Sequence, residues 1–462
     1  MIDSMLLIGY LVFLLVIGYF SGKKLKTARD FALSDRPFGL ITMISTIFAS
    51  FFGGTNLFGV PERMYEVGII FILSFLGNAV NVFLIARTVI DPMSKYRDAI
   101  DLGDIAYEMY GKWGRILTAI CNVVVSAGIV GAQMGVIGAV GRDFLQIDSD
   151  LAIAVGCCVF VLYSGFGGLK AVAFTDLVQF FVFAIILPIV VSIVLQKVGN
   201  INDLWQAIPD SHKTILRPDL GNYILLFIFF CCPGLDPAFV QRILVMGERS
   251  REIAKKAFII LTILTVIYAI LLAILGGCAI LIPNIKPESA FWTVVDNALS
   301  PGMKGVLGIG ILAITMSFAD SDLNVGSISL ARGIIKNVFF PEMSDKTELF
   351  LMRVSTIVFG VAAYFVAKSS TDLLQIIFFF NNFWMPLVVI PIYFGLYGLK
   401  VSTKVFLWAS VCAAFATIYW MIYMPNELDI ESIIVGMIVD LVIMTGGYWY
   451  EKKNHKMIFA KK

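Results

Sequence analysis

Four polar side chains lie on one face of an otherwise apolar stretch, ITMSFADSDLN (residues 314–324). They are Ser317, Asp320, Ser321 and Asn324. Their spacing of i, i+3, i+4 and i+7 places them on one side of an α-helix. Oxygen groups in such a setting can bind a hard cation or exchange a proton, although Ser and Asn alone are also typical of a polar seam between helices. Asp322 points away from this face, and its interpretation is a pairing with a basic side chain rather than a place in the polar face.

A second acid lies in the stretch GGLKAVAFTDLVQ (residues 167–179). Asp176 is about one turn into another apolar segment, next to Thr175 and before Gln179. The preceding GFGGLK is interpreted as a turn, because it lacks the GK[ST] ending of a phosphate-binding loop. Ionisable groups inside apolar segments are functional candidates by default.

The elements that hold these residues are predicted to be transmembrane helices. Of the 462 residues, 59% are hydrophobic and 15% are charged, and the mean hydropathy is +0.88. About 13 runs have the length of roughly 17 to 25 apolar residues that crosses a bilayer. Strands are excluded, since open edges would leave backbone groups unpaired in lipid. The predicted spans are residues 5–21, 38–58, 67–90, 116–141, 151–169, 173–197, 221–241, 257–282, 303–331, 350–368, 372–398, 403–424 and 430–449.

Basic residues predict the orientation of the bundle. Most of the 35 Lys and Arg residues fall in alternate connections and in the tail after residue 450. The positive-inside rule places these segments and the C-terminus in the cytoplasm, with the N-terminus outside. The first run has an acid but no base before its apolar core, which favours a retained span over a cleaved signal. We therefore expect a multi-pass protein of the cytoplasmic (inner) membrane whose basic runs have no role in nucleic-acid binding.

Two predicted spans contain helix breakers at mid-depth. They are the second, with FFGGTN (51–56), and the seventh, with PGLDP (233–237). Irregular backbone at this depth is tolerated only where it lines protein or a water-filled cavity. Breaks five spans apart are typical of secondary transporters built from inverted repeats. Ordinary proline kinks are the alternative interpretation.

Other function classes fit this pattern less well. The seven cysteines form no CxxC pair and the two histidines lie in polar segments, which disfavours a zinc site or a disulfide framework. A channel would be expected to show a repeated filter. An intramembrane aspartyl protease needs two acids that share a proton, which Asp176 and Asp320 could supply, but it leaves the breaks unexplained. The tail after residue 450 is too short for the signalling domain of a sensor.

Three stretches in this order resemble the sodium:solute symporter family, whose members carry proline, sialic acid, sugars or choline. They are GGLKAVAFTDLVQ (167–179), GLDPAFVQRILVMGERSREIAKKA (234–257) and LAITMSFADSDLNVGSISLARGI (312–334). The resemblance implies an all-α polytopic membrane protein with a LeuT-like core of two inverted five-helix repeats, one preceding helix and two following helices. It also implies symport of a small polar organic solute by alternating access. Sodium would be the coupling ion, with no enzymatic activity and no organic cofactor.

The resemblance divides the chain into five parts. They are a first helix and cytoplasmic linker (1–37), a first repeat (38–198), an extracellular loop (199–220), a second repeat (221–398), and two C-terminal helices with a basic cytoplasmic tail (399–462).

The resemblance also implies a principal sodium site made of main-chain carbonyls and hydroxyls. The corresponding positions are Ala49, Phe52, Ile314, Ser317 and Phe318. Most members have Ser or Thr at the last position. Because a phenyl ring supplies no oxygen ligand, this site is predicted to be one ligand short.

A second cation site of some members corresponds to Asp176, Ser317, Asp320 and Ser321. Asp320 replaces a more usual hydroxyl, two residues after the hydroxyl that is lost at position 318. We hypothesise that Asp320 and Asp176 form or relocate the coupling-cation site, because two close carboxylates in a low dielectric do not both stay charged without a cation. A proton meets the same need, so a proton-coupled symporter is the alternative.

By the same resemblance, the solute binds between the two breaks. The corresponding residues are Thr55, Asn56, Asp236, Asn381, Asn382 and Trp384. An acid at position 236 would suit an amine or ammonium group, with aromatic rings adding cation–π attraction. Capping of the broken helix, or pairing with Arg242, is the alternative role for this acid.

Overall fold

The computed structural model describes residues 2–22, 27–33, 37–96, 98–247, 250–370, 372–424 and 430–453, and every regular element in them is helical. In chain order the α-helices are α1 (Ile2–Gly22), α2 (Ala28–Ala32), α3 (Leu40–Ala49), α4 (Gly54–Val67), α5 (Ile69–Phe75), α6 (Gly77–Leu84), α7 (Ile90–Met93), α8 (Leu102–Val140), α9 (Ser149–Gln196), α10 (Ile201–Ala207), α11 (Asp210–Lys213), α12 (Leu220–Cys231), α13 (Pro237–Met246), α14 (Arg251–Ile280), α15 (Ala290–Ala298), α16 (Met303–Ile328), α17 (Asp345–Ala367), α18 (Leu373–Asn381), α19 (Ile390–Leu396), α20 (Thr403–Tyr423) and α21 (Ile430–Lys453). Short π-helical turns, such as Ser329–Phe339 and Met385–Val389, extend several of them.

The number of long apolar helices is smaller than the number of predicted spans. Within the described ranges, nine helices are long and apolar enough to cross a membrane, and the bent pair α3 and α4 makes a tenth. The other three predicted spans fall on apolar stretches within α1 (Asp3–Val16) and the first part of α9 (Ser149–Leu162), and on the two short helices Leu220–Cys231 and Pro237–Met246. In the last case a mid-depth break leaves each half too short to cross alone. Of the predicted basic tail after residue 450, residues 454–462 lie outside the described residues.

The predicted Gly-rich turn between the fifth and sixth spans is a sharp kink within α9. Gly168 has φ +58° and ψ −177°, outside the helical region, so α9 consists of two helices that meet there. Glycine adopts this positive φ without the steric cost that a Cβ would bring. The kink places Asp176 two turns into the second of these helices.

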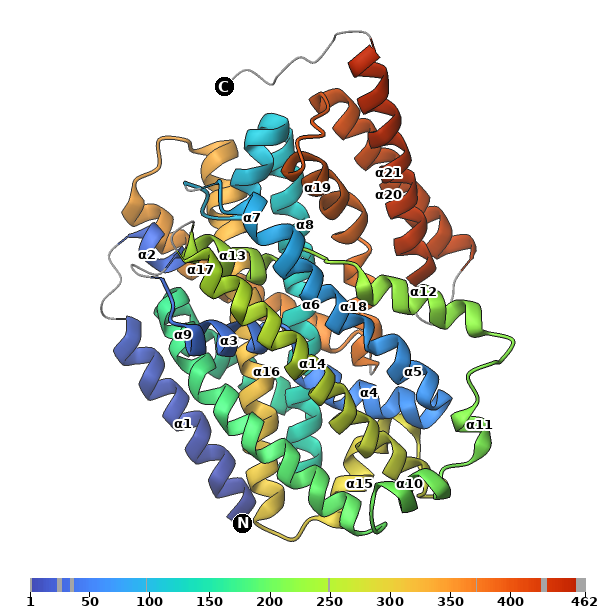
Figure 1. Cartoon of the computed structure of the whole chain (residues 1–462). Coiled ribbons are helices and arrows are strands. Elements are labelled where there is room, and N and C mark those ends of the chain that lie inside the picture. Colours follow the sequence, from blue (N-terminus) through green and yellow to red (C-terminus); the bar gives the residue numbers. More distant parts are fainter. Residues whose placement is uncertain are drawn as a thin grey trace.

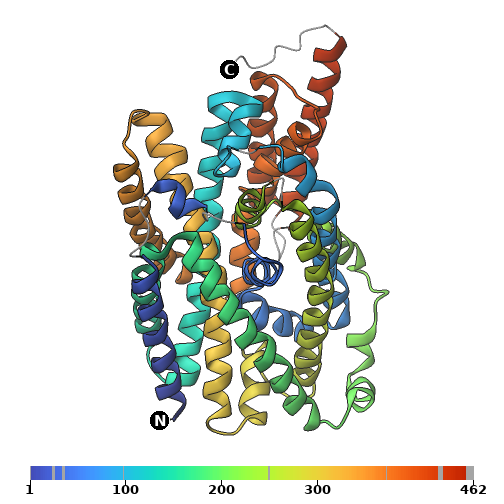
Figure 2. The same ribbon diagram turned by 60° about the vertical axis from the view of Figure 1, so that its left-hand side comes forward.

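The central helix of the bundle is α16. It packs against α1, α8, α9 and α17. The most apolar window of the segment Met303–Phe339 is 89% buried, whereas that of α20 is 28% buried. The first segment therefore has a protein environment, and α20 has the exposed apolar surface of a lipid-facing helix. Figures 1 and 2 show α16 inside the bundle, with α20 and α21 side by side at one edge in Figure 1.

The beginning of α1 and the end of α21 lie at opposite ends of the bundle (Figure 1). Between them α3 lies across the long direction of the molecule and is enclosed by other helices, as the turned view in Figure 2 also shows. The broken segment α3–α4 therefore crosses the interior, beside α16 and α14.

Candidate functional site

The first break lies between the end of α3 and the start of α4, where the two helices are bent by 56°. A Cβ built on Gly53 would lie 2.2 Å from a ring carbon of Phe318 and 2.6 Å from the amide of Gln133. Gln133 uses this space: its Oε1 accepts a bond from Gly54 N (3.0 Å), and its Nε2 donates to Thr55 Oγ1 (3.0 Å). The missing side chain at Gly53 thus allows α8 and α16 to approach the broken backbone.

Gly53→Ala is predicted to lower the melting temperature, because its methyl group has no room beside Phe318 and Gln133. Overpacking of this kind costs about 1–3 kcal/mol. Gly9→Ala is the control, since the space around Gly9 on α1 is open. Thermal unfolding of the two purified variants checks the prediction, and equal melting temperatures would contradict it.

The second break lies between α12 and α13. Leu235 has φ +49°, a left-handed conformation that is uncommon for residues other than glycine. Asp236 caps α13: its Oδ1 accepts hydrogen bonds from Ala238 N (2.8 Å) and Phe239 N (3.4 Å). The indole Nε1 of Trp384 donates to Gly234 O (2.7 Å), which connects the break to the end of α18. The capping role considered from the sequence is therefore present.

A buried polar cluster centres on Asp176 of α9. The hydroxyl of Thr46 on α3 donates to Asp176 Oδ2 (2.5 Å), and the hydroxyl of Ser317 on α16 donates to Asp176 Oδ1. Ser321 lies one turn after Ser317 and accepts a hydrogen bond from Ser50 (2.9 Å). All five side chains are at most 1% exposed. The cluster joins three helices around one carboxylate and several hydroxyl oxygens.

The guanidinium of Arg242 enters this cluster from α13. Its Nη2 donates to Ser321 Oγ (2.7 Å) and lies 3.7 Å from Asp176 Oδ2, and its Nε donates to Thr46 Oγ1 (3.2 Å). Arg242 is fully buried. It therefore engages the same oxygen atoms that a coupling cation would need.

Two further acids of α16 lie outside these contacts. The carboxyl of Asp320 is buried and acts electrostatically on Tyr10 of α1, whose hydroxyl accepts a bond from Gln179 (2.9 Å). The described contacts of Asp176 are with Thr46, Ser317 and Arg242, so the pairing of Asp176 with Asp320 stays a prediction. Asp322 is fully buried, and among the described residues neither of its carboxylate oxygens accepts a hydrogen bond. Its charged neighbours are Asp236 and Arg242.

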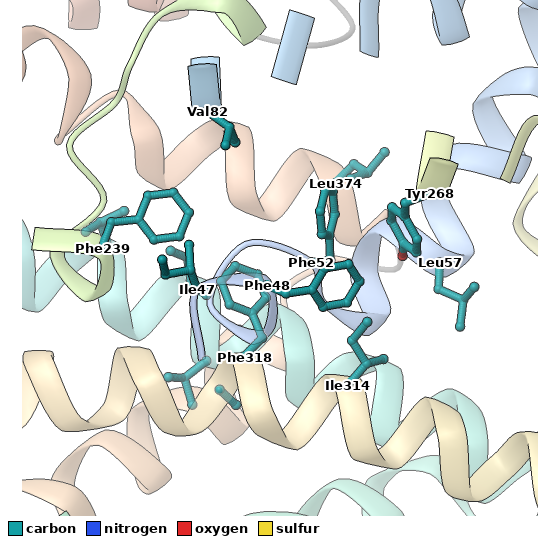
Figure 3. Close-up of a cluster of buried hydrophobic side chains, with 14 of the residues drawn as sticks. Ile47, Phe48, Phe52, Leu57, Val82, Phe239, Tyr268, Ile314, Phe318 and Leu374 are labelled. Atoms are coloured by element: carbon teal, nitrogen blue, oxygen red, sulfur yellow. The ribbon is translucent and has the colours of Figure 1, made fainter. Parts of the chain in front are cut away.

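Phe318 occupies the neighbourhood of the predicted principal sodium site. It projects from α16 towards the broken segment, next to Phe48 and Phe52 (Figure 3). The carbonyl oxygens of Ala49 and Phe52 lie at the break, where the described backbone offers them no hydrogen-bond donor. Two unpartnered carbonyls would suit a cation, but a phenyl ring takes the place of the hydroxyl.

A cavity of about 150 Å³ lies between the two breaks. Its described lining contains ten aromatic side chains, four asparagines and one carboxylate, that of Asp236, and it contains no Lys, Arg or His side chain. An engineered apolar cavity of roughly this volume holds benzene. The space therefore accommodates a small organic molecule.

Four of the six predicted solute-binding residues line this cavity, namely Asn56, Asp236, Asn381 and Trp384. Thr55 is fully buried against Gln133 and does not reach the cavity lining. Asn382 faces α21 instead, where its Oδ1 accepts a hydrogen bond from Ser432 (2.7 Å).

The sequence did not indicate that Thr46 and Gln133 belong to the site, and it indicated Arg242 only as a possible partner of Asp236. Arg242 lies one residue beyond the predicted span 221–241 and was counted with the cytoplasmic flank. Nothing in the sequence distinguishes Thr46 from the other hydroxyl residues of its apolar stretch. Gln133 is the one polar side chain in residues 127–141, and this was the available signal for a buried contact.

The family-level comparison agrees with this architecture. The sodium:solute symporter family matches residues 31–412 of the chain. High-affinity choline transporter 1 of Drosophila melanogaster is 26% identical over 78% of this chain, which spans 61% of that protein's length. The osmoregulated proline transporter OpuE of Bacillus subtilis is 22% identical over 94% of this chain and 92% of its own length.

Two solved structures share the fold. A sodium-coupled sialic acid symporter in a substrate-bound, outward-open state aligns with a TM-score of 0.85 at 16% identity, covering 97% of this chain and 98% of that one. Mhp1, a nucleobase-cation-symport-1 family transporter in a closed conformation, aligns with a TM-score of 0.62 at 14% identity, covering 91% of this chain and 94% of that one. At these identities the likeness shows the fold alone, a polytopic bundle of the LeuT type.

Proposed function

The chain belongs to the sodium:solute symporter family, and from this premise we propose that it uses a sodium gradient to accumulate a small solute that binds in the cavity between the two breaks. Membership makes it a transporter rather than an enzyme. The observation that carries the proposal is the position of this cavity beside the buried cluster of Asp176, Thr46, Ser317 and Ser321. Helix breaks that face a central site are the pattern by which such transporters expose carbonyls to cations and helix ends to solutes.

We assign the coupling cation to the Asp176 cluster. A buried carboxylate with two hydroxyl neighbours supplies the hard oxygen ligands that sodium prefers. The carbonyls of Ala49 and Phe52, which have no described backbone donor, offer a second position, which lacks the hydroxyl that Phe318 replaces. We also keep Asp320, one turn after Ser317 on α16, as a proposed ligand of the coupling cation.

We propose that the ten spanning segments and the shorter apolar helices together make thirteen spans. Spans two to eleven would form the two inverted repeats, with the domain limits 38–198 and 221–398. The opposite positions of the start of α1 and the end of α21 support an odd number of crossings (Figure 1). We place the chain in the cytoplasmic membrane, with its N-terminus outside and its basic tail inside.

Proton coupling is a second candidate, and Phe318 favours it. The ring removes a sodium ligand, while the buried carboxylates of Asp176 and Asp320 can each hold a proton. The two candidates differ in whether the sodium concentration or the pH determines how often the cation site is occupied.

Sodium is expected to raise the melting temperature of the purified protein, whereas potassium at equal ionic strength is not. A ligand at 100 times its dissociation constant stabilises the folded state by about 2.7 kcal/mol. Uptake into proteoliposomes with an inward sodium gradient provides the functional readout. If the melting temperature does not change with sodium but depends steeply on pH, sodium coupling is rejected in favour of proton coupling.

A further inference from the structure

We infer that the solute carries a positively charged nitrogen, as an organic cation or a zwitterion, and that Asp236 is its counter-ion. The inference rests on the proposed function, because it concerns the occupant of the same cavity.

Near the cavity, the buried acids outnumber the buried bases among the described residues. Three buried carboxylates, those of Asp176, Asp236 and Asp322, act on the single guanidinium of Arg242. That guanidinium hydrogen-bonds to Thr46 and Ser321 and lies 3.7 Å from Asp176. Within the part of the chain that the structure describes, it forms no such contact with either of the other two acids. In a low dielectric these acids do not all stay ionised beside one guanidinium, so a bound cation favours their charged forms and a bound anion opposes them.

Asp236 is the acid that a solute can reach. It is the only carboxylate in the described lining of the cavity. Both capping bonds end on its Oδ1, so Oδ2 takes no part in the cap. A carboxylate has about four lone-pair sites, and this leaves capacity for an ammonium group while α13 stays capped.

The wall of the cavity suits the rest of such a molecule. Ten aromatic side chains face it, and the rings of Phe51, Phe239 and Trp384 come from the two breaks and from the end of α18. The faces of aromatic rings attract desolvated cations, with quaternary ammonium groups as a well-known case. The other polar side chains of this wall are mainly four asparagines, which can hydrogen-bond a hydroxyl or carboxylate of the solute, so Asp236 is the side chain that distinguishes a charged amine from a neutral solute.

Asp322 adds to this preference without touching the solute. It follows Phe318, a lining residue, by one helical turn, and so lies on the same side of α16. Its carboxylate has no described hydrogen-bond partner, and the charge of Asp236 acts on it. An ammonium group at Asp236 would lower the electrostatic energy of both acids, so Asp322 is a positioning charge rather than a contact.

The test measures binding of a matched pair of probes in sodium by thermal shift and by competition. Choline and 3,3-dimethylbutan-1-ol have nearly the same shape and differ in whether the central atom is a charged nitrogen or a neutral carbon. Glycine betaine and L-proline extend the panel to zwitterions, and glucose and acetate represent neutral and anionic solutes. At least one ammonium probe is expected to raise the melting temperature, while the neutral isostere, glucose and acetate leave it unchanged.

Asp236→Asn removes the negative charge and keeps the helix cap, because asparagine caps a helix as well as aspartate does. The variant is expected to weaken binding of the ammonium probe by about tenfold or more, since a desolvated charge pair is lost. Asp322→Asn should reduce the preference for the charged probe over its neutral isostere by a smaller factor. Asp148→Asn is the control, because Asp148 also caps a helix, α9, but is exposed and lies outside the cavity lining.

Each outcome decides one question. Failure of all ammonium probes, or binding that Asp236→Asn leaves unchanged, overturns the inference. Sodium-driven uptake of glucose or acetate alone would overturn it while leaving the proposed symport intact. Loss of the sodium-dependent stabilisation in the wild type would instead reject the proposed function. Retention of that stabilisation in Asp236→Asn shows that the variant is folded.

Discussion

Asp176→Asn is expected to abolish the sodium-dependent rise in melting temperature and to reduce sodium-driven uptake by about a hundredfold or more. The variant keeps one carboxamide oxygen, which accepts from only one of the hydroxyls of Thr46 and Ser317 and sets an NH2 group against the other, and it removes the negative charge that they surround. In a low-dielectric interior a neutral amide attracts sodium far less than a carboxylate does. Where the wild type gains about 2.7 kcal/mol at a hundredfold excess of sodium over its dissociation constant, the variant should gain almost none.

The control for this prediction is Asp440→Asn. Asp440 on α21 is also fully buried, and its two oxygens accept no hydrogen bond from the described residues. It therefore tests what the loss of any buried carboxylate does to the fold. Equal sodium stabilisation of Asp440→Asn and the wild type, with loss in Asp176→Asn, assigns the cation to the cluster. A sodium response that survives in Asp176→Asn removes this residue from the site.

The helix positions follow from local physics, which explains why they could be predicted from the sequence. An apolar run of roughly 20 residues must form a helix in lipid, because its backbone groups have no other partner. The breaks were predictable for the same reason: paired glycines at 53–54 and prolines at 233 and 237 disrupt helices locally. The apparent number of spans was less predictable, because a broken span such as α12–α13 consists of two short helices.

The contacts of the site depend on which helix faces which, and hydropathy does not encode that choice. The i, i+4 spacing placed Ser317 and Ser321 on one face, and both reach the polar cluster. The same spacing put Asp320 with them, and its pairing with Asp176 stays a prediction; the described partners of Asp176 also include Thr46 and Arg242, which the spacing did not indicate. A hydroxyl on α3 carries no sign of its partner on α9, 130 residues away. Contacts between helices distant in sequence were therefore the part that could not be derived.

Arg242 is the residue whose role changes most once the contacts are known. From the sequence it was a possible partner of Asp236, which lies six residues earlier on the same segment. In the structure its Nε and Nη2 donate to Thr46 and Ser321, its Nη1 donates within α13 to Gln241 and to the carbonyl of Ala238, and its close charge contact is with Asp176. A fixed positive charge thus stabilises the carboxylate when sodium is absent, and sodium must share or displace it. The strength of sodium binding then depends on competition with this side chain.

Arg242→Gln is expected to change stability and sodium affinity in opposite directions. Without sodium the variant should be less stable by about 3–5 kcal/mol, because it leaves buried acids without their cation. Its sodium affinity should rise by about tenfold or more, since a positive charge about 4 Å from another costs about 4 kcal/mol even at an effective dielectric of 20. Melting temperatures measured across a sodium titration separate the two effects, with Arg242→Lys as the charge-retaining control. Weaker sodium binding by Arg242→Gln would mean that the guanidinium positions the ligands rather than competing with the ion.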